Sequence, residues 1–415
     1  MSRSSLVWLI GAVLLSAADA RADDWPAWRG ATGLGVSAET DLPVRWSATE
    51  NVKWKVALPG PGNSTPIVWG RRVFLTQAVD DGKRRTTMCF DRRDGNELWI
   101  QTVKHDAEER THRDNPYCSA SPVTDGERVI VSHGSAGVFC YDLDGTELWR
   151  RDLGAFQHIW GNAASPMLRG ELCYLNCGPG PRTFLLAVNK RTGKTVWQVD
   201  IPGGLEDGGN EKWIGSWSVP VVVQTGDRTD LVMSFPHTLL GYDPATGDER
   251  WRCGGLGRLV YTSPVVGDGV IVAASGYMGP SMAVRVGGRG DVTESHRLWR
   301  TDRAPQRIGS GVVTGGHLYL VNEPGVAECI EPKTGKTMWK ERLGKECWSS
   351  PVLADGKLYI VDQAGDGHVF RAATTFERIA TNPIGERTRA SIAVSNGELW
   401  IRTYEHLWCI ARKPV

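Results

Sequence analysis

The feature that most constrains the fold is a unit that recurs along almost the whole chain of 415 residues. One half of the unit reads Asp-x-x-Thr-Gly-x-x-x-Trp, with Glu331 to Trp339 as a copy that begins with Glu. This half ends at tryptophans spaced 40 to 54 residues apart: Trp54, Trp99, Trp149, Trp197, Trp251, Trp299 and Trp339. The other half places a small or β-branched residue before a proline and an apolar run: Pro66, Pro122, Pro166, Pro220, Pro264 and Pro351, with Gly311 and Ile392 in two weaker copies. The chain therefore holds eight copies.

A period of 40 to 50 residues with several short strands per copy is typical of a β-propeller, in which each copy forms one four-stranded blade. Within the seventh copy, Asp355-Gly356 separates two apolar runs and predicts a hairpin, and Asp-Gly recurs at Asp125 and Asp268. No stretch beyond the N-terminus has sustained helical periodicity. The predicted fold class is all-β, a single eight-bladed propeller.

The two halves of the unit also suit a radial array. The two residues before each proline position are small or β-branched in all eight copies, as in Ser349 and Ser350. Inner strands crowd together at the axis and outer strands spread apart at the rim, so small residues belong inside and a large flat ring outside. We expect the tryptophans to pack between blades.

The domain organisation follows from the two ends of the chain. Residues 1–22 carry one arginine, an apolar run and small residues at a cleavage position, which predicts a secretory signal peptide and an exported protein. The apolar run is too short to span a bilayer. Residues 23–45 are expected to form an N-terminal arm and residues 46–415 the propeller. Residues 52–58 have no blade of their own and residues 391–410 lack a fourth strand, so the N-terminal strand is predicted to complete the eighth blade.

The run Ala187-x-Asn189-x-x-Thr192-Gly193-x-x-x-Trp197 resembles the tryptophan-docking motif of the pyrroloquinoline-quinone (PQQ) repeat propellers. That group includes the quinoprotein dehydrogenases and the outer-membrane-assembly propeller lipoprotein. The resemblance covers nearly all of the mature chain and implies eight blades. The opening Trp25-Pro-Ala-Trp28-Arg-Gly30 is similar to the start of secreted bacterial proteins with PQQ-binding-like repeats. There is no cysteine at the cleavage position to carry a lipid, unlike in the assembly lipoprotein.

Charge and cysteines exclude several classes of function. The net charge of +1 with no basic run gives no footprint for nucleic acid. Nine cysteines do not form an obvious disulfide framework, because Cys89, Cys140 and Cys329 stand where other copies have Ala187 or Gly241. Buried small side chains are the preferred interpretation, and their disulfide state stays open. No two cysteines are adjacent, whereas quinoprotein dehydrogenases characteristically close a vicinal disulfide over the quinone.

Catalytic motifs are scarce. The chain has no Cys-x-x-Cys-His haem motif, no Gly-x-Ser-x-Gly elbow and no phosphate-binding loop. Cys173 and Cys177 lack a second pair of ligands, and the calcium-like run from Asp362 has Ala373 where the bidentate acid belongs, so no metal site is predicted.

The candidate site is one end of the central channel. In a propeller, the connections from each outer strand to the next inner strand share one face, so the residues just before each proline position converge there. Aromatic and arginine side chains are enriched in binding surfaces. The candidate residues are His112, Asn115, His158, Trp160, Trp213, Trp217, Arg258, Tyr261, Arg307, Trp348 and Arg389. The alternative is that these aromatics merely fill a narrow channel.

The sequence is compatible with two functions. The favoured one is a non-catalytic, periplasmic or secreted scaffold or ligand-binding propeller, monomeric and without a cofactor, that binds an envelope protein, a secreted protein or a small ligand at the channel mouth. The alternative is a quinoprotein alcohol or sugar dehydrogenase with PQQ and Ca²⁺. Only the shared repeat supports the alternative, and a fold does not imply a function. Whether the chain is an enzyme at all is left open by the sequence.

Overall fold

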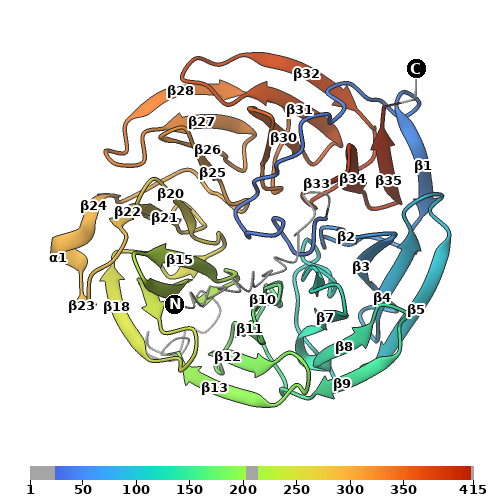
Figure 1. Ribbon diagram of the computed structural model, residues 1–415, viewed down its shortest axis with the longest axis horizontal. Coiled ribbons are helices and arrows are strands. Elements are labelled where there is room, and N and C mark those ends of the chain that lie inside the picture. The colour runs from blue at the N-terminus through green and yellow to red at the C-terminus, as the bar shows by residue number, and fades with distance from the viewer. Residues whose placement is uncertain (1–23, 202–213, 413–415) are drawn as a thin grey trace, which may run out of the picture.

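The computed structural model describes residues 24–201 and 214–412 of the chain. Eight β-sheets of four or five strands stand around a central axis, which confirms the predicted eight-bladed propeller of PQQ-repeat type (Figure 1). The predicted signal peptide and Trp213 lie outside the described residues. Within the described ranges, no helix has the length and apolar character needed to cross a membrane.

Blades are numbered along the chain, and each runs from the inner to the outer strand. The first four blades and a connecting strand comprise β2 (Ile67–Trp69), β3 (Arg72–Val79), β4 (Arg84–Asp91) and β5 (Glu97–Lys104); β6 (Val123–Thr124), β7 (Arg128–Ser132), β8 (Val138–Asp142) and β9 (Glu147–Arg151), with the 3-10 turn η1 (Gly134–Ala136); β10 (Met167–Arg169), β11 (Leu172–Cys177), β12 (Phe184–Asn189) and β13 (Thr195–Asp200); β14 (Gly215–Ser216); and β15 (Val221–Thr225), β16 (Arg228–Phe235), β17 (Thr238–Tyr242) and β18 (Glu249–Gly254).

The last four blades and two further connecting elements comprise β19 (Leu259–Val260); β20 (Val265–Gly267), β21 (Val270–Ala274), β22 (Ser281–Arg285) and β24 (Arg297–Thr301), with β23 (Gly290–Asp291) and α1 (Thr293–His296) inserted; β25 (Val312–Thr314), β26 (His317–Val321), β27 (Val326–Ile330) and β28 (Thr337–Arg342); β29 (Val352–Ala354), β30 (Lys357–Val361), β31 (Asp366–Arg371) and β32 (Arg378–Pro383); and β33 (Ala393–Ser395), β34 (Glu398–Arg402), β35 (His406–Ala411) and β1 (Val52–Ala57).

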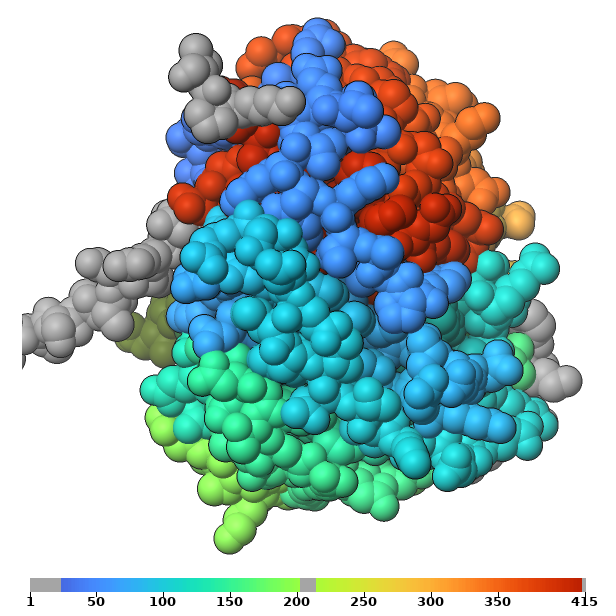
Figure 2. All heavy atoms as spheres, turned by 90° about the vertical axis from the view of Figure 1, so that its right-hand side faces the viewer, coloured from blue at the N-terminus to red at the C-terminus, as the bar shows by residue number. Residues whose placement is uncertain are grey.

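The eighth blade is closed by the N-terminal strand, as predicted. Its strand order is β33, β34, β35 and β1, and β1 pairs antiparallel with β35 so that Trp54 lies opposite Cys409. In Figure 2, the blue N-terminal segment lies against the red C-terminal strands. Pairing the two ends of the chain closes the ring of blades without a gap between the first and the last.

A small residue on the third strand faces the tryptophan of the outer strand. Cys89 lies opposite Trp99, and Ala187 lies opposite Trp197, and in both pairs the register shifts by a bulge directly after the small residue. Gly241 has the same place opposite Trp251. Cys89 is fully buried and not in a disulfide. The cysteines of this position are therefore packing residues, as the sequence predicted.

Each docking tryptophan contacts the next blade. The Trp197 Nε1–H donates to the carbonyl oxygen of Pro244 at 3.0 Å, and a Cβ atom on Gly247 would come within 2.7 Å of the indole. Gly247 has φ of +78°, so glycine both forms the turn and lets the ring approach. Equivalent indole-to-carbonyl bonds of 2.8–3.0 Å are made by Trp54, Trp99, Trp149, Trp299 and Trp339.

Trp251 departs from the predicted pattern because the fifth blade has an insertion in place of the Thr-Gly turn. Its Nε1–H donates instead to Asp230 of its own blade at 3.0 Å, and the ring lies over Gly241. The inserted β23 pairs parallel with β18 and covers its outer edge. The insertion thus replaces tryptophan docking with an added strand.

Hydroxyl groups join the blades around the axis. In every blade but the third, the residue directly before the proline position donates its backbone N–H to the side-chain hydroxyl of the equivalent residue in the next blade. Val219, for example, donates to Ser263 Oγ at 2.8 Å. The same bond, at 2.8–3.2 Å, starts from the N–H of Thr65, Ser121, Ser263, Ser310, Ser350 and Ser391. The Ser165 N–H lacks this bond, because the equivalent residue in the next blade is Val219, which has no hydroxyl. We call this set the hydroxyl ring.

The arm crosses the centre of the ring of blades (Figure 1). Trp25 pairs with Val68 of the first blade, and Val36 pairs with Leu353 of the seventh. Between these anchors, the Arg29 guanidinium is buried at 3% exposure and donates to the carbonyl of Ser310 at 2.6 Å. The arm therefore holds the N-terminal segment across the axis.

Trp197→Ala is expected to lower the free energy of unfolding by roughly 3–5 kcal/mol, because it leaves a cavity between two blades and removes one of the two hydrogen bonds that the Pro244 carbonyl accepts, the other coming from the Tyr174 hydroxyl. Trp197 is 7% exposed. Val196→Ala is the matched control, since the neighbouring Val196 side chain is 48% exposed and its change should stay within about 0.5 kcal/mol. Urea unfolding measures both, and equal midpoints for the two variants would contradict the docking role.

The gap in the hydroxyl ring predicts different effects on stability for two substitutions. Ser263→Ala removes the acceptor of the Val219 N–H and should cost about 1–2 kcal/mol. Val219→Thr adds a hydroxyl next to the Ser165 N–H, for which the described residues provide no acceptor, and should leave stability unchanged or raise it by about 1 kcal/mol. Thermal unfolding of the two single variants tests this, and destabilisation by Val219→Thr as large as that by Ser263→Ala would refute it.

Candidate functional site

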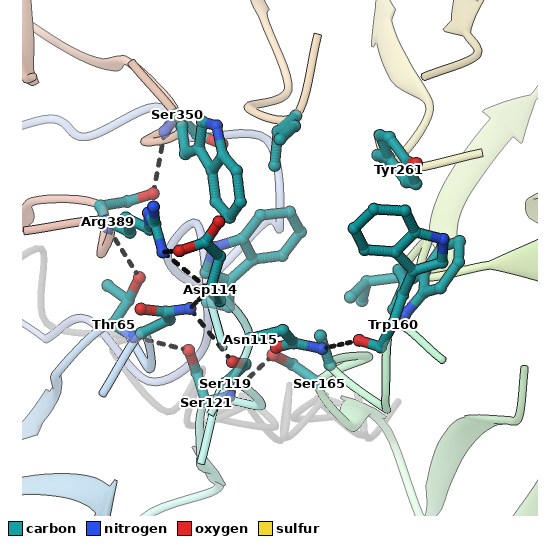
Figure 3. A pocket seen from close by; sticks show the side chains of 18 of the residues that line it. Thr65, Asp114, Asn115, Ser119, Ser121, Trp160, Ser165, Tyr261, Ser350 and Arg389 are labelled. Carbon is teal, nitrogen blue, oxygen red and sulfur yellow. Dashed lines mark hydrogen bonds and ion pairs between the residues drawn. The ribbon is translucent and has the colours of Figure 1, made fainter. Parts of the chain in front are cut away.

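A cavity of about 210 Å³ opens at the channel mouth, on the face that carries the connections between blades (Figure 3). Trp28 of the arm lines it, and also lines a second cavity of about 270 Å³ bounded by Gly30, Leu34 and the inner strands β10 and β15. Trp28 thus lies between the two cavities. The first cavity, called the mouth pocket below, is closed at its inner end by this indole.

The mouth pocket brings together seven of the predicted candidates: His112, Asn115, Trp160, Trp217, Tyr261, Trp348 and Arg389. Further lining residues include Trp28, Asn63, Asp114, Tyr277 and Gln306, together with members of the hydroxyl ring. The convergence of the connections on one face explains why residues from all eight blades meet here. That these seven residues bind a ligand stays a prediction.

One wall of the pocket is aromatic. Trp160, Trp217 and Tyr261 form what we call the aromatic arc: Trp217 and Tyr261 lie edge to face with ring centroids 5.2 Å apart, and Trp160 packs on His112 at 4.7 Å. The short parallel pair β14 and β19 holds the loops of Trp217 and Tyr261 side by side. Trp217 Nε1–H also donates to the Gly161 carbonyl at 2.8 Å. The arc is therefore fixed before any ligand arrives.

The opposite wall carries an ion pair. Arg389 Nη1 lies 2.8 Å from Asp114 Oδ1, and its Nε–H donates to Gln363 Oε1 at 3.0 Å (Figure 3). The guanidinium lies 4.2 Å above the centroid of Trp348, whose indole N–H donates to Glu323 at 2.8 Å. Asp114 and Gln363 thus hold the guanidinium of Arg389 from two other loops, and Trp348 packs against it.

Burial and charge act on the two carboxyl groups of this wall in opposite senses. Burial raises the pKa of Asp114, but the hydrogen bond and the charge of Arg389 outweigh it, so the pKa is lowered. Burial raises the pKa of Glu323, and the bond from Trp348 offsets only part of that rise. Asp114 is accordingly a carboxylate paired with the arginine at neutral pH.

Three other candidates, His158, Arg258 and Arg307, do not line the pocket. His158 is buried behind Trp217, with ring centroids 5.1 Å apart. Arg307 is 5% exposed and bonds the Glu328 carboxylate at 3.2 Å, so it is part of a buried ion pair inside the sixth blade. Arg258 accepts the Gly215 N–H through its carbonyl oxygen at 3.0 Å. These three residues support the site from behind or lie apart from it.

Among the lining residues that sequence reasoning did not select, three carry a charge or a large aromatic ring: Asp114, Tyr277 and Trp28. Asp114 lies beside two candidates, His112 and Asn115. Its negative charge, opposite in sign to that of the candidate Arg389, is the sequence signal that could have identified it. Tyr277 lies in the hairpin between β21 and β22, which opens on the same face. Trp28 comes from the arm, and nothing in its sequence context indicates that it enters the channel.

The described residues contain one group that could hold a metal ion, Glu386, Glu405 and His406, and it does not line the mouth pocket. Glu386 already bonds Thr403 Oγ1 at 2.6 Å, Trp408 Nε1 at 3.1 Å and His406 Nδ1 at 2.9 Å. These bonds account for the group as a local polar cluster in the eighth blade. In the mouth pocket, the arrangement of fixed rings and one ion pair is suited to binding.

A family of PQQ-repeat proteins described as outer membrane protein assembly factor BamB matches residues 32–116, 83–178, 182–289 and 289–377. The chain belongs to this family. A BamB of Moranella endobia is 23% identical over 269 residues, which are 60% of this chain and 63% of the relative. The chain thus spans less than two thirds of the length of that relative.

Solved structures agree on the fold. BamB from Moraxella catarrhalis has a TM-score of 0.60 at 13% identity, over 85% of this chain and 95% of that structure. Quinohemoprotein alcohol dehydrogenase from Comamonas testosteroni has a TM-score of 0.68 at 13% identity, over 96% and 82%. At these identities the likeness shows the propeller, and the function has to come from the site.

Proposed function

We propose that this BamB-family chain is an exported, non-catalytic propeller that binds a partner of the bacterial envelope at the mouth pocket. The observation that carries the proposal is the pair of unlike walls. A side-chain plug would use similar residues around the axis, whereas here an aromatic arc faces a buried arginine paired with Asp114. A concave site with aromatic walls and a few fixed polar groups is the usual form of a binding site.

The family adds support for a binding role. Its description names an outer membrane protein assembly factor, and we extend a role in the assembly of envelope proteins to this chain. The predicted signal peptide would place this chain in the periplasm or outside the cell, where such partners occur. A soluble monomer with one occupied face is the simplest arrangement.

The oxidoreductase alternative requires a site for PQQ and Ca²⁺, and the described residues do not fit one. Ca²⁺ takes about 6–8 oxygen ligands. Among the described residues that line the mouth pocket, Asp114 is the only carboxylate and Arg389 the only guanidinium, and they neutralise each other. A quinone that carries several carboxylates would find no unpaired cation. Absorbance after addition of PQQ and Ca²⁺, followed by a dye-linked alcohol assay, checks this directly.

Trp348→Ala and Arg389→Ala are each expected to weaken binding of the partner by about 1–3 kcal/mol, the range of moderate hot spots. The partner is first recovered from the native envelope with the immobilised mature chain, then purified and titrated calorimetrically against each variant. Trp348→Phe is the matched control, because it keeps a ring beneath Arg389 while losing the bond to Glu323.

Melting curves of the same variants distinguish binding from packing. If affinity is unchanged while the melting temperature falls, the two residues only fill the channel and the proposed function is wrong. If affinity falls for the alanine variants but not for Val196→Ala on the rim, the mouth pocket is the binding surface.

A further inference from the structure

A strained aromatic residue stands at the rim of the mouth pocket. Tyr277 and Met278 form the tip of the hairpin between β21 and β22, with φ of +53° and +63°. They are 53% and 43% exposed. Residues with bulky side chains disfavour this backbone region, and glycine adopts it freely. The turn thus holds an aromatic ring in the open at a cost in stability, which is a feature of ligand-binding loops.

The ring of Tyr277 continues the aromatic surface of the pocket. Tyr277 lines the same cavity as the aromatic arc and Trp28. The pocket therefore has aromatic groups on one wall, at its inner end and at its rim. Flat aromatic faces pack well against the C–H groups of a ring-shaped ligand.

The polar groups of the pocket favour a ligand without charge. Asp114 and Arg389 pair at 2.8 Å, and a charged ligand would have to compete with one of them. The pair instead offers a fixed acceptor beside a fixed donor, and His112 lies 3.5 Å from Asp114. Side by side, such groups match the hydroxyls of a neutral ligand, which both donate and accept.

The size of the pocket limits the ligand further. Its volume of about 210 Å³ lies below the range of about 300–1,000 Å³ that is usual for clefts that bury drug-sized ligands. A ligand with one six-membered ring and its substituents suits a pocket of this size. Because Trp28 closes the inner end, a peptide cannot pass through the channel, and only a small molecule or a terminal group fits.

We propose that the mouth pocket binds one neutral saccharide residue, with a C–H face of the sugar on the aromatic arc, its hydroxyls on Asp114 and Arg389, and Tyr277 over the exposed side. This inference rests on the proposed function and names its ligand class. A free sugar and the terminal sugar of a glycan present the same ring to these groups.

The test is a titration of the full mature chain, followed by tryptophan fluorescence and calorimetry. The probes are the methyl glycosides of glucose, galactose, mannose and N-acetylglucosamine, which distinguish a single ring, and cellobiose and maltose, which represent a glycan end. N-acetyl-tryptophanamide represents the rival ligand, an aromatic side chain of a protein. We expect at least one saccharide to bind and to quench the indole fluorescence.

Two glycine variants separate binding from folding. Tyr277→Gly relieves the backbone strain and removes the ring, so we expect saccharide binding about tenfold weaker with a melting temperature that is unchanged or higher. Met278→Gly relieves similar strain but removes a side chain outside the lining, so it should keep the wild-type affinity. A merely structural Tyr277 would lower the melting temperature and leave the affinity unchanged, which overturns the inference.

The other possible results of the titration also test the saccharide inference. If no saccharide binds, or if only N-acetyl-tryptophanamide does, the saccharide inference is wrong. The proposed function still stands in that case if Trp348→Ala and Arg389→Ala weaken binding of the captured partner. If those two variants bind the partner like the wild type, the proposed function fails separately.

Discussion

Six indole rings each donate a hydrogen bond to a carbonyl of the neighbouring blade, and the rest of the propeller depends on this contact. A single four-stranded sheet has two faces to cover, and in this fold they are covered mainly by other blades, with N-terminal residues such as Trp25 and Trp46 packed into the same core. Docking at the rim sets how far each blade turns from the previous one. The hydroxyl ring repeats the connection at the axis, where Ser263 and its equivalents link inner strands through backbone N–H groups. Because neighbouring blades are bonded both at the rim and at the axis, the central channel has a fixed width.

The channel becomes a pocket because the arm closes one end. Arg29 is buried beneath the sixth blade and has no carboxylate partner among the described residues; it bonds the carbonyl oxygens of Leu34 and Ser310, and burial lowers its pKa. This anchor holds Trp28 in the channel, with a cavity on each side. The shape of the mouth pocket therefore depends on a segment that is not itself part of a blade.

The mouth pocket differs from the rest of the molecule in the way its residues are held. Trp217, Trp348 and Arg389 are each fixed by a bond to a loop from another blade. Because those partners lie in different connections, the ring of blades sets the site geometry, and no single loop contains it. Tyr277 is the exception, since the turn that carries it is strained and exposed.

The sequence by itself determined the number and order of the blades, the closing role of β1 and the docking positions. These features follow from a local pattern that repeats. Nearly every blade has a tryptophan, a Thr-Gly turn and a small residue before its inner strand, so nearly every blade packs in the same way. Even so, the sequence did not predict the bond of Trp251 to Asp230, because the insertion removed the turn on which the tryptophan would dock.

Only the tertiary structure decided which channel residues meet. Arg307 and Arg389 occupy neighbouring repeat positions just before an inner strand, yet Arg307 pairs with Glu328 inside its blade while Arg389 reaches Asp114 in the pocket. The direction of each side chain depends on which carboxylate lies within reach, and those carboxylates come from segments that only the closed ring brings together.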